Sequence, residues 1–67
     1  MEITRTQKQL TALLKALNLK MEQVIGVMLA LQKEEQQLEM MNYIIENKDT
    51  ITEDMISEQL LEILDKN

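Results

Sequence analysis

The side chains that enzymes most often use for nucleophilic and acid–base chemistry are scarce in this 67-residue chain. It contains no cysteine and no histidine, the groups most used as nucleophile and general base near neutral pH. Ser57 is its only serine, and only carboxylates and lysines could activate it. Catalysis by paired carboxylates needs two acids facing each other across a cleft, whereas the spacing here places the acids on the outer faces of helices. We therefore expect a protein that is not an enzyme.

Metal and cofactor sites are not expected either. Without histidine and cysteine, a structural zinc site lacks its usual ligands. Asn47 and Asp49 begin an alternating pattern like that of an EF-hand calcium loop. Ile51 stands at its third position, however, and the glycine and terminal glutamate of that loop are missing. We interpret this segment as a capped turn, and we expect no catalytic, metal-binding or cofactor-binding residue.

Charge is divided unevenly along the chain. Residues 1–20 carry four basic side chains and one carboxylate, and residues 21–67 carry three and eleven, so local net charges of +3 and −8 give the total of −5. The basic row is either an ordinary solvated helix face or a docking surface for acidic groups, including the acidic row of a second copy. The candidate partner surface consists of Arg5, Lys8, Lys15, Lys20, Asp54, Glu58 and Glu62.

The apolar spacing between positions 10 and 27 resembles a helix-turn-helix unit. The residues at its buried positions are Leu10, Leu13, Leu17, Leu19, Val24 and Val27, with Asn18 at the turn. Leu14 departs from the pattern, since a small residue is expected where the two helices cross. The resemblance implies a DNA-binding transcriptional regulator. A reading helix must present polar side chains to base edges, but the expected second helix is almost wholly apolar after Gln23, and nucleic-acid-binding proteins are usually basic overall.

Residues 24–31 form an uncharged run that must be covered on more than one side. On a helix their large side chains span an arc of about 200°, roughly twice the stripe that a surface helix needs. Within the run, Gly26 and Ala30 lie one turn apart and form a small-residue seam. A helical glycine costs about 1 kcal/mol relative to alanine, and a close crossing with another helix at this seam would offset that cost.

Local signals predict four helices, over residues 5–17, 21–32, 34–47 and 53–65. Thr4 and Gln7 have the spacing of a capping box, and Asn18 can adopt the left-handed conformation that ends a helix. The chain has no proline and one glycine, so the second and third helices lack a clear boundary. A continuous helix over 21–47 would be about 40 Å long, too long for a domain of this size, and we expect a bend near Gln32–Glu34.

Two of these helices have a predicted inward stripe that the structure can test. In the third helix, the stripe consists of Leu38, Met41 and Ile45, broadened by Met40 and Ile44. In the fourth helix, it consists of Ile56, Leu60, Ile63 and Leu64.

The chain as a whole is predicted to be one all-α domain over residues 1–67, a compact bundle of three or four short helices with a helix-turn-helix-like first pair. Because a domain this small is marginally stable without disulfides or metals, and because the second and third helices have wide apolar arcs, we predict a homodimer. The expected interface consists of Gly26, Ala30, Met40, Met41 and Ile44.

The predicted function is that of a small, acidic, cytoplasmic protein-interaction or regulatory module without enzymatic activity. The alternatives are the DNA-binding regulator and an acidic inhibitor that occupies a basic site on a partner protein. No membrane association is expected, since the longest uncharged run falls far short of the ~18 residues that a membrane span needs.

Overall fold

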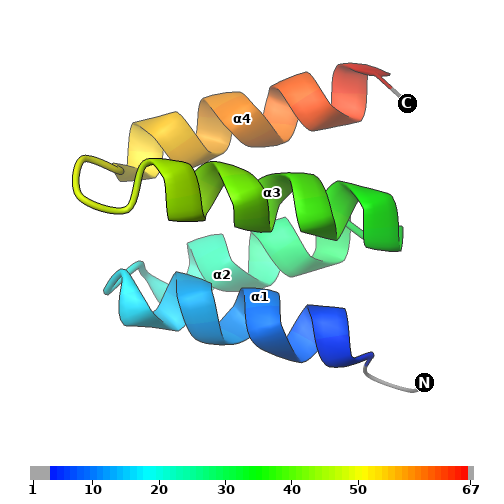
Figure 1. The fold of residues 1–67 in the computed structure, drawn as a ribbon, viewed down its shortest axis with the longest axis horizontal. Helices are drawn as coiled ribbons and strands as arrows, with labels where there is room; N and C mark the ends of the chain where they lie inside the picture. The colour runs from blue at the N-terminus through cyan, green and yellow to red at the C-terminus, as the bar shows by residue number, and fades with distance from the viewer. Residues whose placement is uncertain (1–3, 67) are drawn as a thin grey trace.

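A computed structural model describes residues 4–66, which form four helices and no strand (Figure 1). The helices are α1 (Arg5–Ala16), α2 (Met21–Ala30), α3 (Glu34–Glu46) and α4 (Glu53–Lys66). The predicted all-α class is confirmed, and the predicted helix ends lie within two residues of the observed ones. No helix in the described part of the chain is long and apolar enough to cross a membrane.

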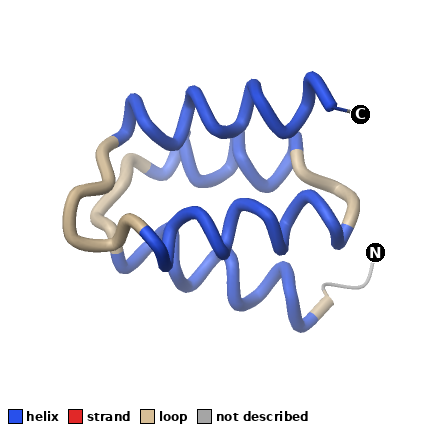
Figure 2. The backbone as a smooth tube through the Cα atoms, turned by 45° about the horizontal axis from the view of Figure 1, so that its top comes forward, coloured by secondary structure: helices blue, strands red, loops and turns tan. Residues whose placement is uncertain are grey.

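The order of the helices around the bundle is α1, α2, α4, α3. Helices α2 and α3 are consecutive in the sequence but lie diagonally opposite each other, as do α1 and α4. Helices α1 and α3 run in one direction and α2 and α4 in the other (Figures 1 and 2). The bundle therefore has two broad faces on opposite sides, the α1/α3 face and the α2/α4 face.

The core receives apolar side chains from all four helices. Its buried members are Leu10, Leu14, Val24, Val27, Leu31, Met40, Ile44, Ile56 and Ile63. Spacings of three, four and seven residues place the members from each helix on one side of that helix. The stripe predicted for α3 is partly wrong, because Met40 and Ile44 are buried whereas Leu38 and Ile45 are exposed. In α4, Leu64 is also exposed, so it lies at the edge of the predicted stripe.

Helix α1 begins and ends with the predicted signals. The Thr4 hydroxyl oxygen accepts a hydrogen bond of 3.1 Å from the Gln7 backbone N–H, and the Gln7 side-chain oxygen accepts one of 2.9 Å from the Thr4 N–H. Beyond the helix, Asn18 has a φ of 59°, the left-handed conformation that lets the chain reverse. The tight α1–α2 connection is as predicted. The two helices run alongside each other in opposite directions (Figures 1 and 2), as a hairpin rather than the steep crossing of a DNA-binding pair.

The predicted bend between α2 and α3 is confirmed. Leu31 ends α2 with a φ of −98° and a ψ of 82°, outside the helical region. The Gln37 side-chain amide donates a hydrogen bond of 2.8 Å to the Leu31 carbonyl oxygen, and the Lys33 N–H donates one of 3.1 Å to the Gln36 side-chain oxygen. Glutamine side chains thus stabilise a break that contains neither glycine nor proline.

Candidate interaction surface

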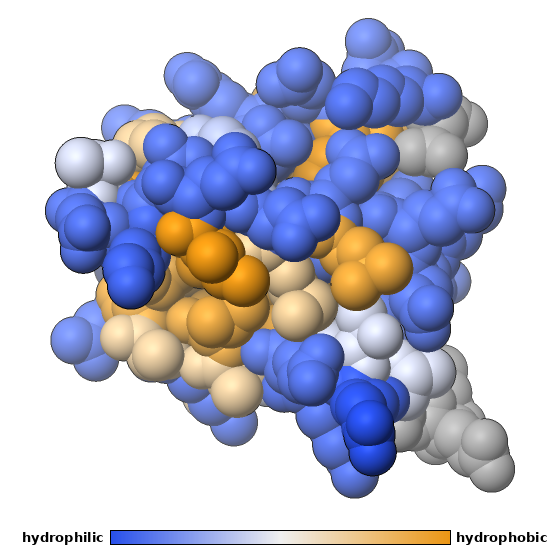
Figure 3. All heavy atoms as spheres, in the orientation of Figure 1, coloured by the Kyte–Doolittle hydropathy of each residue, from blue (hydrophilic) through white to orange (hydrophobic). Residues whose placement is uncertain are grey.

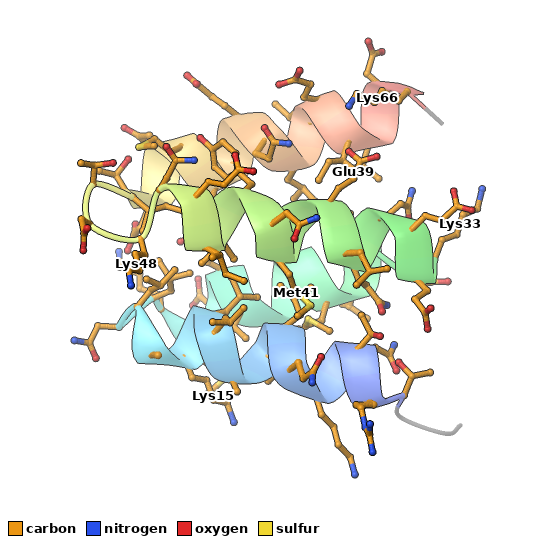
Figure 4. All side chains as sticks on the ribbon, viewed as in Figure 1. Lys15, Lys33, Glu39, Met41, Lys48 and Lys66 are labelled. Atoms are coloured by element: carbon orange, nitrogen blue, oxygen red, sulfur yellow. The ribbon has the colours of Figure 1, made fainter. Side chains whose placement is uncertain are left out.

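The predicted basic residues lie on the solvent side of the bundle. Arg5, Lys8 and Lys15 are exposed on α1, on the side of the helix away from buried Leu10 and Leu14. Figure 4 shows Lys15 pointing away from the other helices. Three of the four predicted basic residues therefore form one row, which we call the basic row. The fourth, Lys20, is exposed at the N-cap of α2.

The predicted acidic residues form a second row on α4. Asp54, Glu58 and Glu62 are all exposed and recur every four residues, which places them along one side of the helix. We call these residues the acidic row. Helices α1 and α4 make no contact and form opposite edges of the bundle in Figure 1. The structure therefore does not bring the two rows together within one chain and leaves the molecule polarised, basic at one edge and acidic at the other.

A row of large apolar side chains on α2 faces solvent. Met21, Ile25 and Leu29 are 57, 49 and 66% exposed, on the opposite side of the helix from buried Val24 and Val27. The apolar run of residues 24–31 predicts one wide arc, in which this row is not distinguished from the core. The signal was present, because the exposed residues recur every four positions and the buried residues fall between them.

Two leucines of α4 form a second exposed apolar surface. The Gln23 side-chain amide donates hydrogen bonds to the Glu53 carbonyl oxygen, at 3.1 Å, and to the Ser57 hydroxyl oxygen, at 3.4 Å. These contacts show which side of α4 faces α2. Leu61 and Leu64 follow Ser57 at four and seven residues, on that same side, and they are 67 and 38% exposed. The apolar row of α2 lies on the side of that helix away from Gln23, and therefore away from α4, so it does not share one face with these two leucines.

The predicted small-residue seam lies on a different side of α2 from the apolar row. Gly26 and Ala30 follow Gln23 at three and seven residues, which places them on the side of α2 that faces α4. Gly26 is exposed, Ala30 is half-buried, and a Cβ atom added at Gly26 would have no atom within 4 Å outside its own helix backbone. The close crossing predicted at this seam is therefore not made within the described chain.

The predicted dimer interface needs correction. Met40 and Ile44 are 0 and 2% exposed, so the chain's own core already covers them. Met41 lies between α3 and α1 (Figure 4), on the opposite side of the bundle from Gly26. The prediction assumed that the second and third helices share one surface, but their diagonal arrangement places Met41 and the seam on different faces.

The α1/α3 face carries a smaller apolar surface. Leu38 and Ile45 are 43 and 53% exposed on α3, with half-buried Met41 between them in the sequence. Figure 3 shows apolar groups gathered over α3 and α1 on this face. With two large exposed apolar side chains rather than the three of the α2 row, it is the lesser candidate for an interface.

A cavity of about 300 Å³ opens where the N-termini of α1 and α3 meet the end of α2, lined by residues that include Gln7, Met28, Glu34 and Gln37. The described residues contain no group of three side chains suited to hold a metal ion. The Gln37 side-chain oxygen has almost no accessible surface, so a molecule in the cavity would not reach it. The residues that line the cavity include no histidine, cysteine or serine.

Comparison with known proteins gives no match to a protein-family model, a curated protein or a solved structure. The fold and surface define a small four-helix domain with charge-polarised edges and exposed apolar side chains on α2, α3 and α4.

Proposed function

We propose that the protein is a non-enzymatic interaction module that acts as a homodimer through exposed apolar side chains of α2 and α4. The supporting observation is the exposure of Met21, Ile25 and Leu29 on α2 and of Leu61 and Leu64 on α4. Soluble monomers rarely expose large contiguous apolar patches, and such patches often mark protein–protein interfaces. A second copy would remove these side chains from water.

The surface available on the chain is large enough for a stable dimer. A standard interface buries about 800 Å² of each partner, about one sixth of the 4890 Å² that this chain exposes. One broad side of a four-helix bundle supplies an area of that order. The described chain also lacks disulfides and metal clusters, so association would provide stabilisation that domains of this size often need.

Light scattering coupled to size-exclusion chromatography tests this proposal. The expected mass is twice the 7.9 kDa of the chain at concentrations of about 1 to 100 µM, a range that spans ordinary dimer affinities. Replacing Leu29 and Leu61 with serine should give a folded monomer, because both side chains are exposed. The matched control replaces Leu38 and Ile45 of α3 with serine and should remain dimeric. A wild-type monomer throughout this range would refute the proposal.

A second candidate is an acidic inhibitor that uses the acidic row to occupy a basic site on a partner protein. Its specific support is the regular exposure of Asp54, Glu58 and Glu62 on α4. Reversing the charges of Glu58 and Glu62 should then abolish capture of that partner without loss of helicity. Capture that survives the reversal would rule this candidate out.

DNA binding is the weaker candidate. Lys20 is exposed at the start of α2, but the row that α2 presents to solvent is apolar and offers little to base edges. A DNA-binding role predicts duplex affinity that falls steeply with added salt and is lost when Lys8 and Lys20 become alanine. Absence of binding to duplex DNA at about 50 mM salt would exclude it.

A further inference from the structure

We infer that the α1/α2 side of the bundle binds an acidic amphipathic helix of a partner protein. The α1/α2 side is the surface that joins the basic row of α1 to the exposed apolar row of α2, which consists of Met21, Ile25 and Leu29. This inference rests on the proposed role as an interaction module, but it does not require the homodimer. It specifies the chemistry of a second kind of partner.

The apolar row lies on the part of α2 that adjoins α1. The hydrogen bonds from Gln23 to α4 show which side of α2 faces that helix, and the apolar row lies on the other side. Helix α1 is the second neighbour of α2. Leu29 also lines the same cavity as Thr4 and Gln7, at the start of α1. The exposed apolar side chains of α2 therefore lie next to α1.

Two lysines of the basic row lie on the part of α1 that adjoins α2. Gln7 lines that cavity together with residues of α2, so its side of α1 faces α2. At 3.6 residues per turn, Lys15 and Lys8 lie about 80° and 100° around the helix from Gln7, whereas buried Leu10 lies about 60° in the other direction. Both lysines are exposed, and Figure 4 shows Lys15 pointing outward. The basic and apolar rows therefore share one side of the bundle.

Charge complementarity identifies the partner as acidic. Helices α1 and α2 together carry three basic side chains and one carboxylate, whereas α3 and α4 together carry one and nine. The α1/α2 side is therefore the part of this acidic protein that attracts negative groups, and the other two helices repel them. Such an arrangement steers an acidic partner to one side of the molecule.

The dimensions of the two rows match a helix. Lys8 and Lys15 are seven residues apart, about 10 Å along α1, and Met21 and Leu29 are eight residues apart, about 12 Å along α2. Each row thus spans about two helical turns. A helix lying along α1 and α2 places apolar side chains at three- and four-residue spacing on the apolar row, while carboxylates seven residues apart reach the two lysines.

The surface between the two lysines favours a polypeptide over a lipid surface. Thr11 and Ala12 have short side chains, and together with Lys8 and Lys15 they line a shallow depression of about 280 Å³. A side chain of a docked helix fills this depression, whereas a flat layer of lipid headgroups passes over it. The docked helix also covers the apolar row, so the partner and a second copy of the chain compete for α2.

Paramagnetic relaxation from a labelled peptide tests the position of the partner. The probe is a helix-forming peptide of about 18 residues, five turns, with leucines at three- and four-residue spacing, glutamates on the adjoining side and a nitroxide at its centre. The same peptide with a diamagnetic label is the control. Broadening of ¹⁵N amides centred on residues 8–15 and 21–29 supports the inference. Broadening centred on residues 38–45 or 61–64, or no broadening in the dilute protein, overturns it.

Charge exchange provides the second test. Lys8→Glu combined with Lys15→Glu should raise the dissociation constant of the acidic peptide at least about tenfold, because two attractions become repulsions. A peptide with lysine in place of glutamate should bind this double variant better than it binds wild type. Lys48→Glu changes an exposed turn residue and should have a smaller effect than either single variant, and circular dichroism checks that all variants are folded.

The remaining outcomes separate this inference from the alternatives. Equal affinity of wild type and the double variant for the acidic peptide would overturn it. Binding to vesicles that contain phosphatidylserine, without binding to the peptide, would assign the α1/α2 side to an anionic membrane instead and overturn the choice of a protein partner. A monomeric wild type that binds the peptide would refute the proposed dimer and support this inference.

Discussion

The side-chain amide of Gln37 donates a hydrogen bond of 2.8 Å to the carbonyl oxygen of Leu31, six residues earlier. Leu31 and Gln37 are 0 and 2% exposed, so the bond joins the end of α2 to the first turns of α3 inside the protein. The side-chain oxygen of Gln37 has no hydrogen-bond partner among the described residues. A buried unpaired acceptor costs about 1–3 kcal/mol, so the donor to Leu31 is the part of this side chain that stabilises the fold.

Gln37→Glu should make the stability of the fold depend on pH. Burial raises the pKa of the introduced carboxyl group above its ordinary value of about 4.3. The protonated acid can donate to the Leu31 carbonyl oxygen as the amide does, whereas the carboxylate cannot. Stability relative to wild type should therefore be greatest below about pH 4 and should be lost as the pH rises through the folded-state pKa. Urea unfolding followed by circular dichroism between about pH 4 and 8 measures this.

Gln37→Leu is the matched control for that experiment. It removes both the donor and the unpaired oxygen without adding a titratable group, so the free energy of unfolding should change by less than the loss of the donor alone would cause, with no comparable pH dependence. Equal pH profiles for the two variants would contradict the proposed role of the amide.

Substitutions at Asn18 should separate backbone strain from side-chain contacts. Its φ of 59° lies in the left-handed region, which most side chains disfavour by about 1–2 kcal/mol. Asn18→Ala should lower the free energy of unfolding by about 1 kcal/mol, and Asn18→Gly should preserve or raise it. Thermal unfolding of the two variants checks the order. A more stable alanine variant would show that the α1–α2 turn does not require this conformation.

Gly26→Ala should stabilise the isolated chain. The position is helical, and an added Cβ would meet open space, so the variant should gain about 0.5–1 kcal/mol of helix stability. Ala12→Gly, at an exposed position in α1, is the reverse control and should lose a similar amount. Chemical denaturation at a protein concentration below dimer formation measures both changes. A destabilised alanine variant under those conditions would mean that a neighbouring group occupies the space at Gly26.

Met40 and Leu61 should differ sharply in their effects on folding. Met40 is fully buried and Leu61 is 67% exposed. Met40→Ala should cost about 2–5 kcal/mol, because it leaves a cavity in the core, and Leu61→Ala should change the stability of the monomer by no more than about 0.5 kcal/mol. The leucine variant should instead weaken association. Denaturation curves of the dilute proteins provide the comparison, and similar losses for the two variants would contradict the assigned faces.

The helix boundaries could be predicted from the sequence because the interactions that define them are local. Thr4 and Gln7 form the predicted capping box within four residues, and Asn18 reverses the chain by its own backbone conformation. The break between α2 and α3 was inferred from the length of the alternative helix, although the hydrogen bond that holds it depends on Gln37. That contact requires α3 to be already folded back, so propensity alone could not identify it.

The side of each helix that is buried was harder to predict from the sequence. Helix α3 carries two apolar rows with similar spacing, one through Leu38 and Ile45 and one through Met40 and Ile44. Which row is buried depends on where α1 and α4 lie, and no local pattern contains that information. The charged rows were correctly predicted to face solvent. Their separation onto opposite edges, however, follows from the diagonal order of the helices, which spacing alone does not define.

The break at Leu31–Lys33 also bears on how copies of the chain could exchange parts. It contains neither glycine nor proline, so the same residues can continue a helix. A straight helix over residues 21–46 would be about 39 Å long, beyond the 32 Å longest extent of the folded chain, and α1 could no longer fold back against α3 of its own chain. Two straightened chains would regain those contacts by domain swapping. A swapped dimer would separate on dilution only as fast as its chains unfold, whereas a dimer joined by surface contacts would dissociate at once.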